Sequence, residues 1–237
     1  MRKFQWLMAL GACALISSAA MAQPALYKAA IDDAGRPTAD KDQDAERHVA
    51  TVLGVAGVRP GQKVVDLMPG GGYYTRIWSK IVGPRGSVWT ASGNMGNAAV
   101  RAIDADNANY PNVDIIPTAL RNLKTPAPAD VVFTSRNYHD LHNRGGDPAP
   151  VNAAVFSVLK RGGTFVILDH RALPGIVSEP LHRIDPAMVI KEVEAAGFKL
   201  LRRSDALARD TDPKNIGVTD PSVRGKTDQF ILVFRKP

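Results

Sequence analysis

Histidine and aspartate residues gather in three short stretches of the second half of the chain. They are His139, Asp140, His142, Asp169, His170 and His182. An imidazole with a pKa near 6.5 can take a proton from a nucleophile as that nucleophile attacks. His139 is the first candidate for such a general base, and Asp140 and His170 complete the candidate catalytic set.

The same side chains also suit other roles. Imidazole nitrogens and carboxylate oxygens are ligands of divalent metals, and the pair Asp140-x-His142 could chelate one. No H-x-x-x-H or similar spacing on one element supports such a site, so we predict no metal-binding residues. A structural role is equally open, in which Asp140 caps a helix or turn and the histidines bond to loop carbonyls.

A run of three glycines lies in the stretch KVVDLMPGGGYYTR, residues 63–76. Glycine allows positive φ and lets a ligand approach the backbone, while the helix that follows offers unpaired N–H groups to a negative group. Gly70 and Gly72 therefore indicate a site for a nucleotide or nucleoside.

The residues around these glycines narrow the class of ligand. A dinucleotide-binding fingerprint needs a third glycine and an acidic residue about 20 positions further on. This chain has Thr75 and Ser92 at those two places. Asp66, inside the preceding strand, instead suits a ligand with a cationic amino-acid end.

Strands and helices alternate through most of the chain. Strands are expected at 63–68, 87–91, 113–117, 130–135, 164–169, 199–203 and 229–234. Helices are expected at 40–55, 73–82, 98–109, 150–159 and 186–196. This alternation predicts an α/β fold, a Rossmann-like, seven-stranded and mostly parallel sheet with helices on both faces.

Two further expectations follow from this order of elements. Turn residues and no helical pattern fill the segment 204–228, so the last strand is expected to run antiparallel to its neighbour. Loops at the carboxyl edge of a parallel sheet converge over one crevice, so the histidines and the glycine turn are expected to lie together.

Three residues near these elements are expected to be structural. Trp78 has the spacing of a core residue on its helix. Arg183 and Asp185 are expected to pair with each other or to cap the helix that begins after them.

The first 22 residues have the pattern of a cleaved signal peptide. Arg2 and Lys3 precede an apolar run over 5–20, and Ala20-Met21-Ala22 has the small-x-small form of a cleavage site. The apolar run is shorter than the roughly 20 residues of a spanning helix, which disfavours a transmembrane anchor.

The signal pattern sets the expected location and domain organisation. We expect a periplasmic or secreted protein without stable membrane insertion, and a lipoprotein modified at Cys13 is the less favoured alternative. An N-terminal arm is expected over 23–40 and a single domain over 41–237. Cys13 is the only cysteine, so disulfides and cysteine metal sites are excluded.

Composition argues against nucleic-acid binding. The 237 residues carry a formal charge of +7, or +5 without Arg2 and Lys3, and the basic residues are scattered. A nucleic-acid site would need a basic stripe interleaved with aromatic residues. No extra domain is evident that would grip a macromolecule, so the expected partner is a small-molecule substrate.

The stretch VVDLMPGGGYYT resembles motif I of the class I S-adenosylmethionine-dependent methyltransferases. The resemblance is closest to a bacterial group of predicted methyltransferases with signal peptides, through NYHDLH at 137–142, LKRGGTFVILDHR at 159–171 and GKTDQFILVFRKP at 225–237. It implies a seven-stranded sheet with a reversed last strand, S-adenosyl-L-methionine as cofactor and methyl transfer as the activity.

The resemblance also implies particular cofactor-binding residues. In the family pattern, Asp66 would hold the methionine amino group, directly or through water. Gly70 and Gly72 would make room for the cofactor. Independently of the resemblance, the position of Asn137 after the fourth strand predicts that it orients cofactor or substrate.

Three positions differ from many relatives. Met68 stands where glycine is common, and Ser92 and Ala119 stand where relatives place acidic residues for the ribose and the adenine amine. Met68 would line the cofactor site, and Ser92 would offer the ribose a weaker hydrogen bond.

Three hypotheses therefore compete. The leading one is methyl transfer to an unidentified small-molecule acceptor. The alternative is a non-catalytic small-ligand-binding protein on a methyltransferase fold, because a fold alone does not fix an activity. The third is a metal-dependent hydrolase or lyase that uses the histidine cluster.

Overall fold

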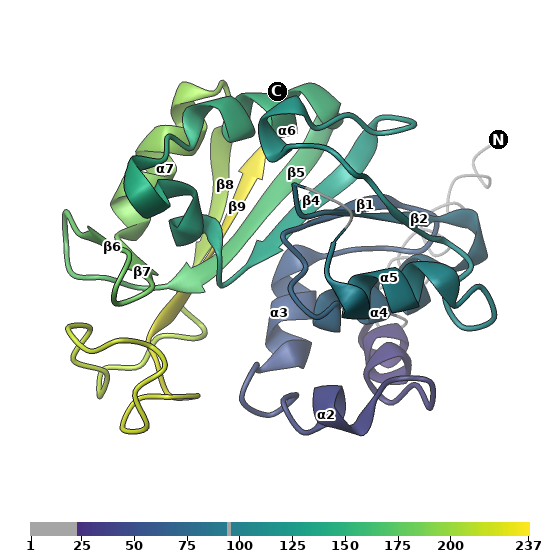
Figure 1. The fold of residues 1–237 in the computed structure, drawn as a ribbon, viewed down its shortest axis with the longest axis horizontal. Coiled ribbons are helices and arrows are strands. Elements are labelled where there is room, and N and C mark those ends of the chain that lie inside the picture. The colour runs from purple at the N-terminus through teal and green to yellow at the C-terminus, as the bar shows by residue number, and fades with distance from the viewer. Residues whose placement is uncertain (1–22, 94–95) are drawn as a thin grey trace, which may run out of the picture.

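The computed structural model describes residues 23–93 and 96–237, and it is a layered α/β fold with a twisted sheet between helices (Figure 1). The strands are β1 (Lys63–Leu67), β2 (Ser87–Ala91), β3 (Val113–Ile115), β4 (Ala129–Ser135), β5 (Leu159–His170), β6 (Val177–Ser178), β7 (Arg183–Ile184), β8 (Lys199–Ser204) and β9 (Gln229–Arg235). The α-helices are α2 (Thr38–Lys41), α3 (Val49–Ala56), α4 (Tyr73–Val82), α5 (Ala98–Ala105), α6 (Ala149–Val158) and α7 (Pro186–Ala195).

The main sheet has seven strands in the order β3-β2-β1-β4-β5-β9-β8. Neighbouring strands from β3 to β5 pair in parallel, whereas β9 runs antiparallel to both β5 and β8. The expected sheet with a reversed last strand is confirmed. The strand order reverses between β1 and β4, and ligands of such sheets bind beyond the carboxyl ends of the strands at that point.

Each face of the sheet buries its own hydrophobic core. Residues of α3, α4 and the helical residues 23–31 pack on one face, and residues of α6 and α7 pack on the other. Trp78 of α4 is fully buried, with its ring 5.0 Å from that of Phe133 of β4. The core position expected for Trp78 is confirmed.

The N-terminal segment differs from the expected extended arm. Residues 23–31 are helical, and Tyr27 and Ala30 are buried in the core. The Tyr27 hydroxyl donates a hydrogen bond to the Val58 carbonyl at 3.0 Å. The helix expected over 40–55 begins only at Val49, after a series of turns. The prediction of an arm was wrong because the turn residues that follow this short helix dominated the composition of the whole segment.

Small elements lie beside the carboxyl edge of the sheet. After β4, the 3-10 helix η3 (Tyr138–Gly145) carries the first histidine group, and β6 pairs with β7 in a small antiparallel hairpin. Two further 3-10 helices are η1 (Gly83–Arg85) and η2 (Leu120–Asn122). The sequence pattern indicated none of these elements because each is very short.

The segment 205–228 has no helix, as expected, and a buried ion pair fastens it to β7. Arg183 donates to Asp212 at 2.7 and 3.0 Å, and both side chains are inaccessible to solvent. Asp185 instead caps α7 by accepting a hydrogen bond from the Ala187 N–H at 2.8 Å. The capping role was therefore predicted correctly, but the partner of Arg183 was not.

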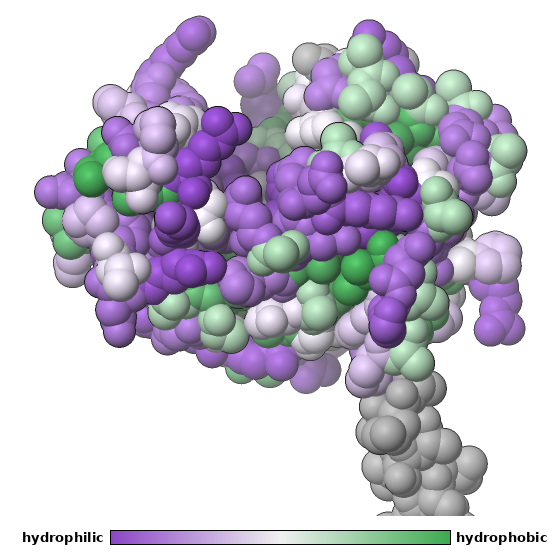
Figure 2. Space-filling model, turned by 90° about the horizontal axis from the view of Figure 1, so that it is seen from below, coloured by the Kyte–Doolittle hydropathy of each residue, from purple (hydrophilic) through white to green (hydrophobic). Residues whose placement is uncertain are grey.

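The surface seen from below in Figure 2 is mainly hydrophilic, with hydrophobic residues in smaller patches between polar ones. Within the part of the chain that the structure describes, no helix combines the length and apolar character needed to cross a bilayer. The expected signal peptide and Cys13 lie outside the described residues.

Candidate functional site

Asp66 lies near the carboxyl end of β1 and is almost completely buried, with 2% of its surface exposed. Its carboxyl accepts a hydrogen bond from the Thr75 hydroxyl of α4 at 2.6 Å. Burial raises the pKa of Asp66 to about 7, and the hydrogen bond from Thr75 only partly opposes this shift. A cationic group that enters the site would therefore stabilise the charged form of this carboxyl.

Gly70 and Gly72 both have positive φ, of 56° and 79°. A Cβ atom added to Gly70 would meet nothing within 4 Å, which fits the expected room for a ligand. A Cβ added to Gly72 would lie 2.2 Å from the Cδ1 atom of Ile103 in α5. Gly72 thus has a packing role in addition to the role beside the cofactor that is expected of it.

Met68 also has a left-handed backbone conformation, with φ of 56°. Its N–H donates to the Ala91 carbonyl at 2.7 Å, and its carbonyl accepts from the Asn137 side-chain amide at 2.5 Å. These two bonds fasten the glycine turn that follows β1 to the end of β2 and to the residue before η3. Glycine adopts such a conformation without steric cost, which explains why it suits this position.

A pocket of about 250 Å³ opens above the turn, and we call it the Asp66 pocket. Its wall includes Asp66, Met68, Gly70 and Asn137, which the sequence predicted, and Arg47 and Arg136, which it did not. One buried acidic residue and two arginines therefore line the same small pocket.

Arg47 reaches the Asp66 pocket from the segment before α3. Its guanidinium lies 4.3 Å from the centre of the Tyr73 ring and donates to the Gln43 side-chain oxygen at 2.8 and 3.0 Å. Burial, with a smaller effect of the positive charge of Arg136, lowers the pKa of Arg47. An anion placed beside Arg47 would relieve both effects.

Arg136 comes directly after β4 and has positive φ of 61°. Its guanidinium contacts Glu46 at 3.2 Å and donates to the Gln229 side chain at 3.3 Å. Arg136 could have been found from the sequence, because it occupies the sheet edge from which Asn137 was selected. Arg47 had no such signal.

A second pocket shares Met68, Gly70 and Asn137 with the first, and we call it the Ser92 pocket. Its other lining residues are Ser92, Gly96, Asn97 and Asp140. The Asn97 amide donates to the Gly70 carbonyl at 2.7 Å and ties α5 to the glycine turn. Ser92 therefore lines a pocket that adjoins the Asp66 pocket at Met68, Gly70 and Asn137.

The histidine and aspartate residues meet beside this cavity. Nδ1 of His139 lies 2.8 Å from the Asp169 carboxylate, which also accepts a hydrogen bond from the His139 N–H at 2.9 Å. Nε2 of His139 lies 3.3 Å from Asp140 Oδ1 and 3.2 Å from His182 Nδ1. The expected convergence at the sheet edge is confirmed for these four residues.

The protonation of His139 disfavours the general-base role assigned to it. Burial alone would lower its pKa, but the charge of Asp169 and the hydrogen bonds of Asp140 and Asp169 outweigh burial and raise the pKa to about 10. A histidine that already carries its second proton at neutral pH cannot accept another.

His170 and His142 face other partners. Nδ1 of His170 lies 2.8 Å from the Thr227 hydroxyl, and burial, followed by the charge of Arg136, holds its pKa well below the usual range. Nε2 of His142 lies 3.2 Å from Glu192. Neither histidine is among the residues that line the Asp66 and Ser92 pockets.

Comparison with known proteins gives sequence relatives but no matching family model. The chain is 32% identical over 185 residues to the ubiquinone/menaquinone biosynthesis C-methyltransferase UbiE of Vibrio campbellii, and 30% identical over 184 residues to that of Vibrio parahaemolyticus. Both alignments cover 75% of this chain and 63% of the relative, so the chain spans less than two thirds of the length of these relatives.

Solved structures share the fold. A SAM-dependent methyltransferase from Aquifex aeolicus aligns with a TM-score of 0.59 at 21% identity, covering 89% of this chain and 97% of that one. The chain is similar in sequence to these C-methyltransferases and shares its fold with this SAM-dependent methyltransferase. The same fold also serves the [4+2]-cyclase SpnF, with a TM-score of 0.61 at 17% identity over 87% of this chain and 85% of that one.

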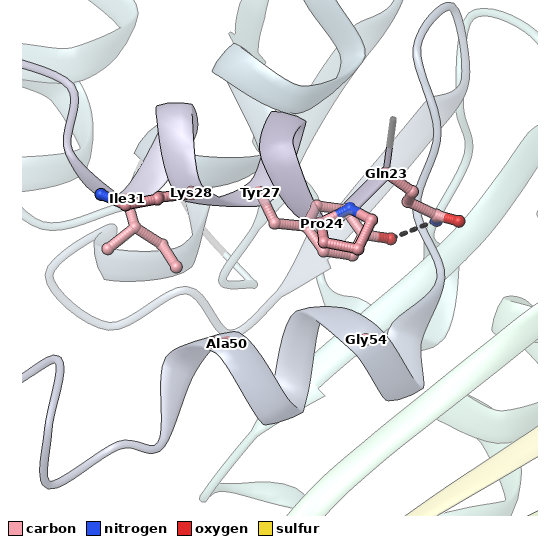
Figure 3. A pocket seen from close by; sticks show the side chains of 7 residues that line it. All are labelled: Gln23, Pro24, Tyr27, Lys28, Ile31, Ala50 and Gly54. Atoms are coloured by element: carbon pink, nitrogen blue, oxygen red, sulfur yellow. Dashed lines mark hydrogen bonds between the residues drawn. The ribbon is translucent and has the colours of Figure 1, made fainter. Parts of the chain in front are cut away.

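A further pocket lies between the helical residues 23–31 and α3 (Figure 3). Gln23 and Tyr27 form a hydrogen bond at one end of it, and Ala50 and Gly54 lie on the facing helix. None of the candidate site residues lines this pocket. The candidate site residues therefore lie at the sheet edge and not in this pocket.

Proposed function

We propose that this protein transfers a methyl group from S-adenosyl-L-methionine to a small-molecule acceptor. The observation that carries the proposal is the charge pattern of the Asp66 pocket, which is lined by the buried Asp66 and by two arginines, Arg47 and Arg136. The amino-acid end of the cofactor carries an ammonium and a carboxylate. Carboxylates bind ammonium groups and arginines bind carboxylates through charge-assisted hydrogen bonds.

The residues present fit the cofactor along its length. Asp66 would hold the ammonium group, and Arg47 and Arg136 would hold the carboxylate. The space that a Cβ on Gly70 would fill is available to the ligand. Ser92, in the adjoining pocket, would donate a hydrogen bond to a ribose hydroxyl.

The bound cofactor supplies an electrophilic methyl group on a sulfonium. The protein's part is to align an acceptor with that methyl group and to exclude water. Asp140 lines the Ser92 pocket, and 38% of its side-chain surface is exposed, so it is positioned to contact an acceptor. Asp169 orients His139, and His139 contacts Asp140 and so acts as a positioning residue that holds it at the pocket wall.

The names of the sequence relatives suggest which class of methyl acceptor to test first. Both UbiE relatives are named for C-methyl transfer in ubiquinone and menaquinone biosynthesis. A carbon acceptor is therefore the first class to screen. The relatives do not favour the non-catalytic alternative, and methyl transfer that is lost in Asp66→Ala would exclude it.

The test is a calorimetric titration of the protein with S-adenosylmethionine and with its demethylated product. We expect micromolar binding, about −8 kcal/mol, which Asp66→Ala abolishes. Asp114→Ala, which changes an exposed aspartate of β3, is the matched control and should bind normally. If neither ligand binds the wild-type protein, the proposal fails.

We also propose that the protein works in the periplasm or outside the cell, on the strength of the signal pattern in residues 1–22. Cell fractionation with N-terminal sequencing tests this. A mature chain that starts near Gln23 in the periplasmic fraction would support it. An uncleaved chain in the cytosolic fraction would contradict it.

A further inference from the structure

Beside the Ser92 pocket, two imidazole nitrogens and one carboxylate oxygen lie close to one another. Nε2 of His139, Oδ1 of Asp140 and Nδ1 of His182 are separated by 3.2, 3.3 and 3.6 Å. We propose that these three residues bind one divalent transition-metal ion of the Zn²⁺ type. The proposal does not depend on methyl transfer, and its test uses no cofactor.

The separations match the geometry of a tetrahedral site. Zinc binds histidine nitrogen and carboxylate oxygen at about 2.0–2.2 Å, so two ligand atoms of a tetrahedral ion lie about 3.3–3.6 Å apart. The three measured separations fall at or next to this range. A single ion can therefore reach all three atoms without a large movement of the backbone.

The surroundings of His139 orient it as a ligand, and a bound metal ion would displace the proton that Nε2 carries in the metal-free protein. Asp169, which is inaccessible to solvent, accepts hydrogen bonds from Nδ1 and from the backbone N–H of His139. A carboxylate on the far ring nitrogen fixes the orientation of a metal-binding histidine and increases its basicity. This arrangement leaves Nε2 directed at Asp140 and His182.

Charge and exposure also favour a cation here. Asp140 and Asp169 bring two negative charges, which a divalent ion would balance. The His139 side chain is 2% exposed, whereas those of Asp140 and His182 are 38% and 46% exposed, so an ion can enter from solvent. Three protein ligands leave a coordination position for water or a substrate atom, as in catalytic zinc sites.

The site lies at the wall of the Ser92 pocket, because Asp140 belongs to both. The sequence shows no metal-binding motif for this site, because His182 follows His139 by 43 residues and comes from the loop before β7. The competing account is an ion pair of protonated His139 with its two aspartates, without affinity for metal. The two accounts differ in whether the protein binds Zn²⁺, and the metal site also requires that binding depends on His182.

The experiment measures metal binding to the full chain after removal of metals with a chelator. Zn²⁺ is titrated by calorimetry, and Co²⁺ is titrated by its visible absorption, which is stronger for four-coordinate than for six-coordinate ions. His182→Asn removes one ligand, and asparagine tolerates the left-handed conformation of this residue, with φ of 53°. His142→Asn makes the same chemical change at a histidine that faces Glu192 instead.

We expect one Zn²⁺ per chain with an affinity that His182→Asn and Asp140→Asn each reduce at least tenfold. His142→Asn should retain the wild-type affinity. Circular dichroism and thermal unfolding establish that each variant is folded. Wild-type protein that binds no stoichiometric Zn²⁺ or Co²⁺ overturns the proposal, as does a His182→Asn variant that binds as tightly as wild type.

Discussion

The hydroxyl of Thr75, in the first turn of α4, donates a hydrogen bond to the buried carboxyl of Asp66 at 2.6 Å. This bond crosses the glycine turn and joins the strand to the helix on either side of it. It also gives the charged form of Asp66 a partner in a place where burial otherwise favours the neutral acid.

The affinity for S-adenosylmethionine should rise with pH. Binding of an ammonium group needs the carboxylate form of Asp66, whose pKa is about 7. The carboxylate fraction, and with it the affinity, should increase about eightfold from pH 6 to pH 7.5. Calorimetry across this range measures it. Asp66→Asn should bind weakly with no such increase, and an equal pH dependence in that variant would assign the titration to another group.

The same pKa predicts the opposite trend for the stability of the ligand-free protein. A carboxyl whose pKa is raised on folding binds more protons in the folded than in the unfolded state between about pH 4 and 7. The contribution of Asp66 to the free energy of unfolding should therefore fall as pH rises through this window. Urea unfolding of wild type and Asp66→Asn at several pH values tests this, and parallel pH profiles would contradict it.

Gly70→Ala and Gly72→Ala should separate ligand binding from packing. The Cβ at Gly70 enters open space, so the variant should lose affinity for S-adenosylmethionine at least about tenfold and stability by about 1–2 kcal/mol for its positive φ. The Cβ at Gly72 meets Ile103, which adds an overpacking cost of about 1–3 kcal/mol. Calorimetry and urea unfolding of both variants measure the difference, and equal stability losses would refute it.

Met68→Gly should be tolerated, whereas Met68→Val should not. Glycine removes the steric cost of the positive φ but also removes the side chain, so we expect a net change within about 1 kcal/mol. A β-branched residue in this conformation is a true outlier, and we expect Met68→Val to lose about 2 kcal/mol. Thermal and urea unfolding give both values. Equal stability of the two variants would show that the backbone relaxes at this position.

Arg183→Met should destabilise the protein by about 3–5 kcal/mol, because it leaves the Asp212 carboxylate buried without its partner. Loss of Asp212 as well should recover part of this cost, so the double variant Arg183→Met, Asp212→Leu should be more stable than the single one. Lys191→Met, at an exposed position of α7, should change stability by less than about 0.5 kcal/mol. Urea unfolding of the three variants would contradict the prediction if Arg183→Met resembled Lys191→Met.

The helices and strands that position the site were predicted accurately from the sequence. Residues 73–82 form a helix and residues 87–91 a strand with the expected bounds. Both segments have strong periodic patterns that end at glycine or turn residues. The pattern around residues 23–31 was weaker, and its helix is stabilised by tertiary packing of Tyr27 and Ala30 on the core.

The site was predicted less completely than the fold. The rule that strand ends converge brought His139, Asp140 and His182 together correctly. It could not give the pKa of His139, which depends on the contact between η3 and Asp169 near the end of β5. It could not place Arg47 either, because that side chain enters the pocket from outside the strand-and-helix alternation.

The position of β9 also constrains the order in which the protein can fold. This strand is the last in the sequence, yet it lies between β5 and β8 in the sheet. Strand β8 therefore has no hydrogen-bonded neighbour in the sheet until residues 229–235 have left the ribosome. Strands β1 to β5 can pair earlier, so the cavity is shaped first, and the half of the sheet that carries the loop with Asp212 closes only after synthesis of the final strand.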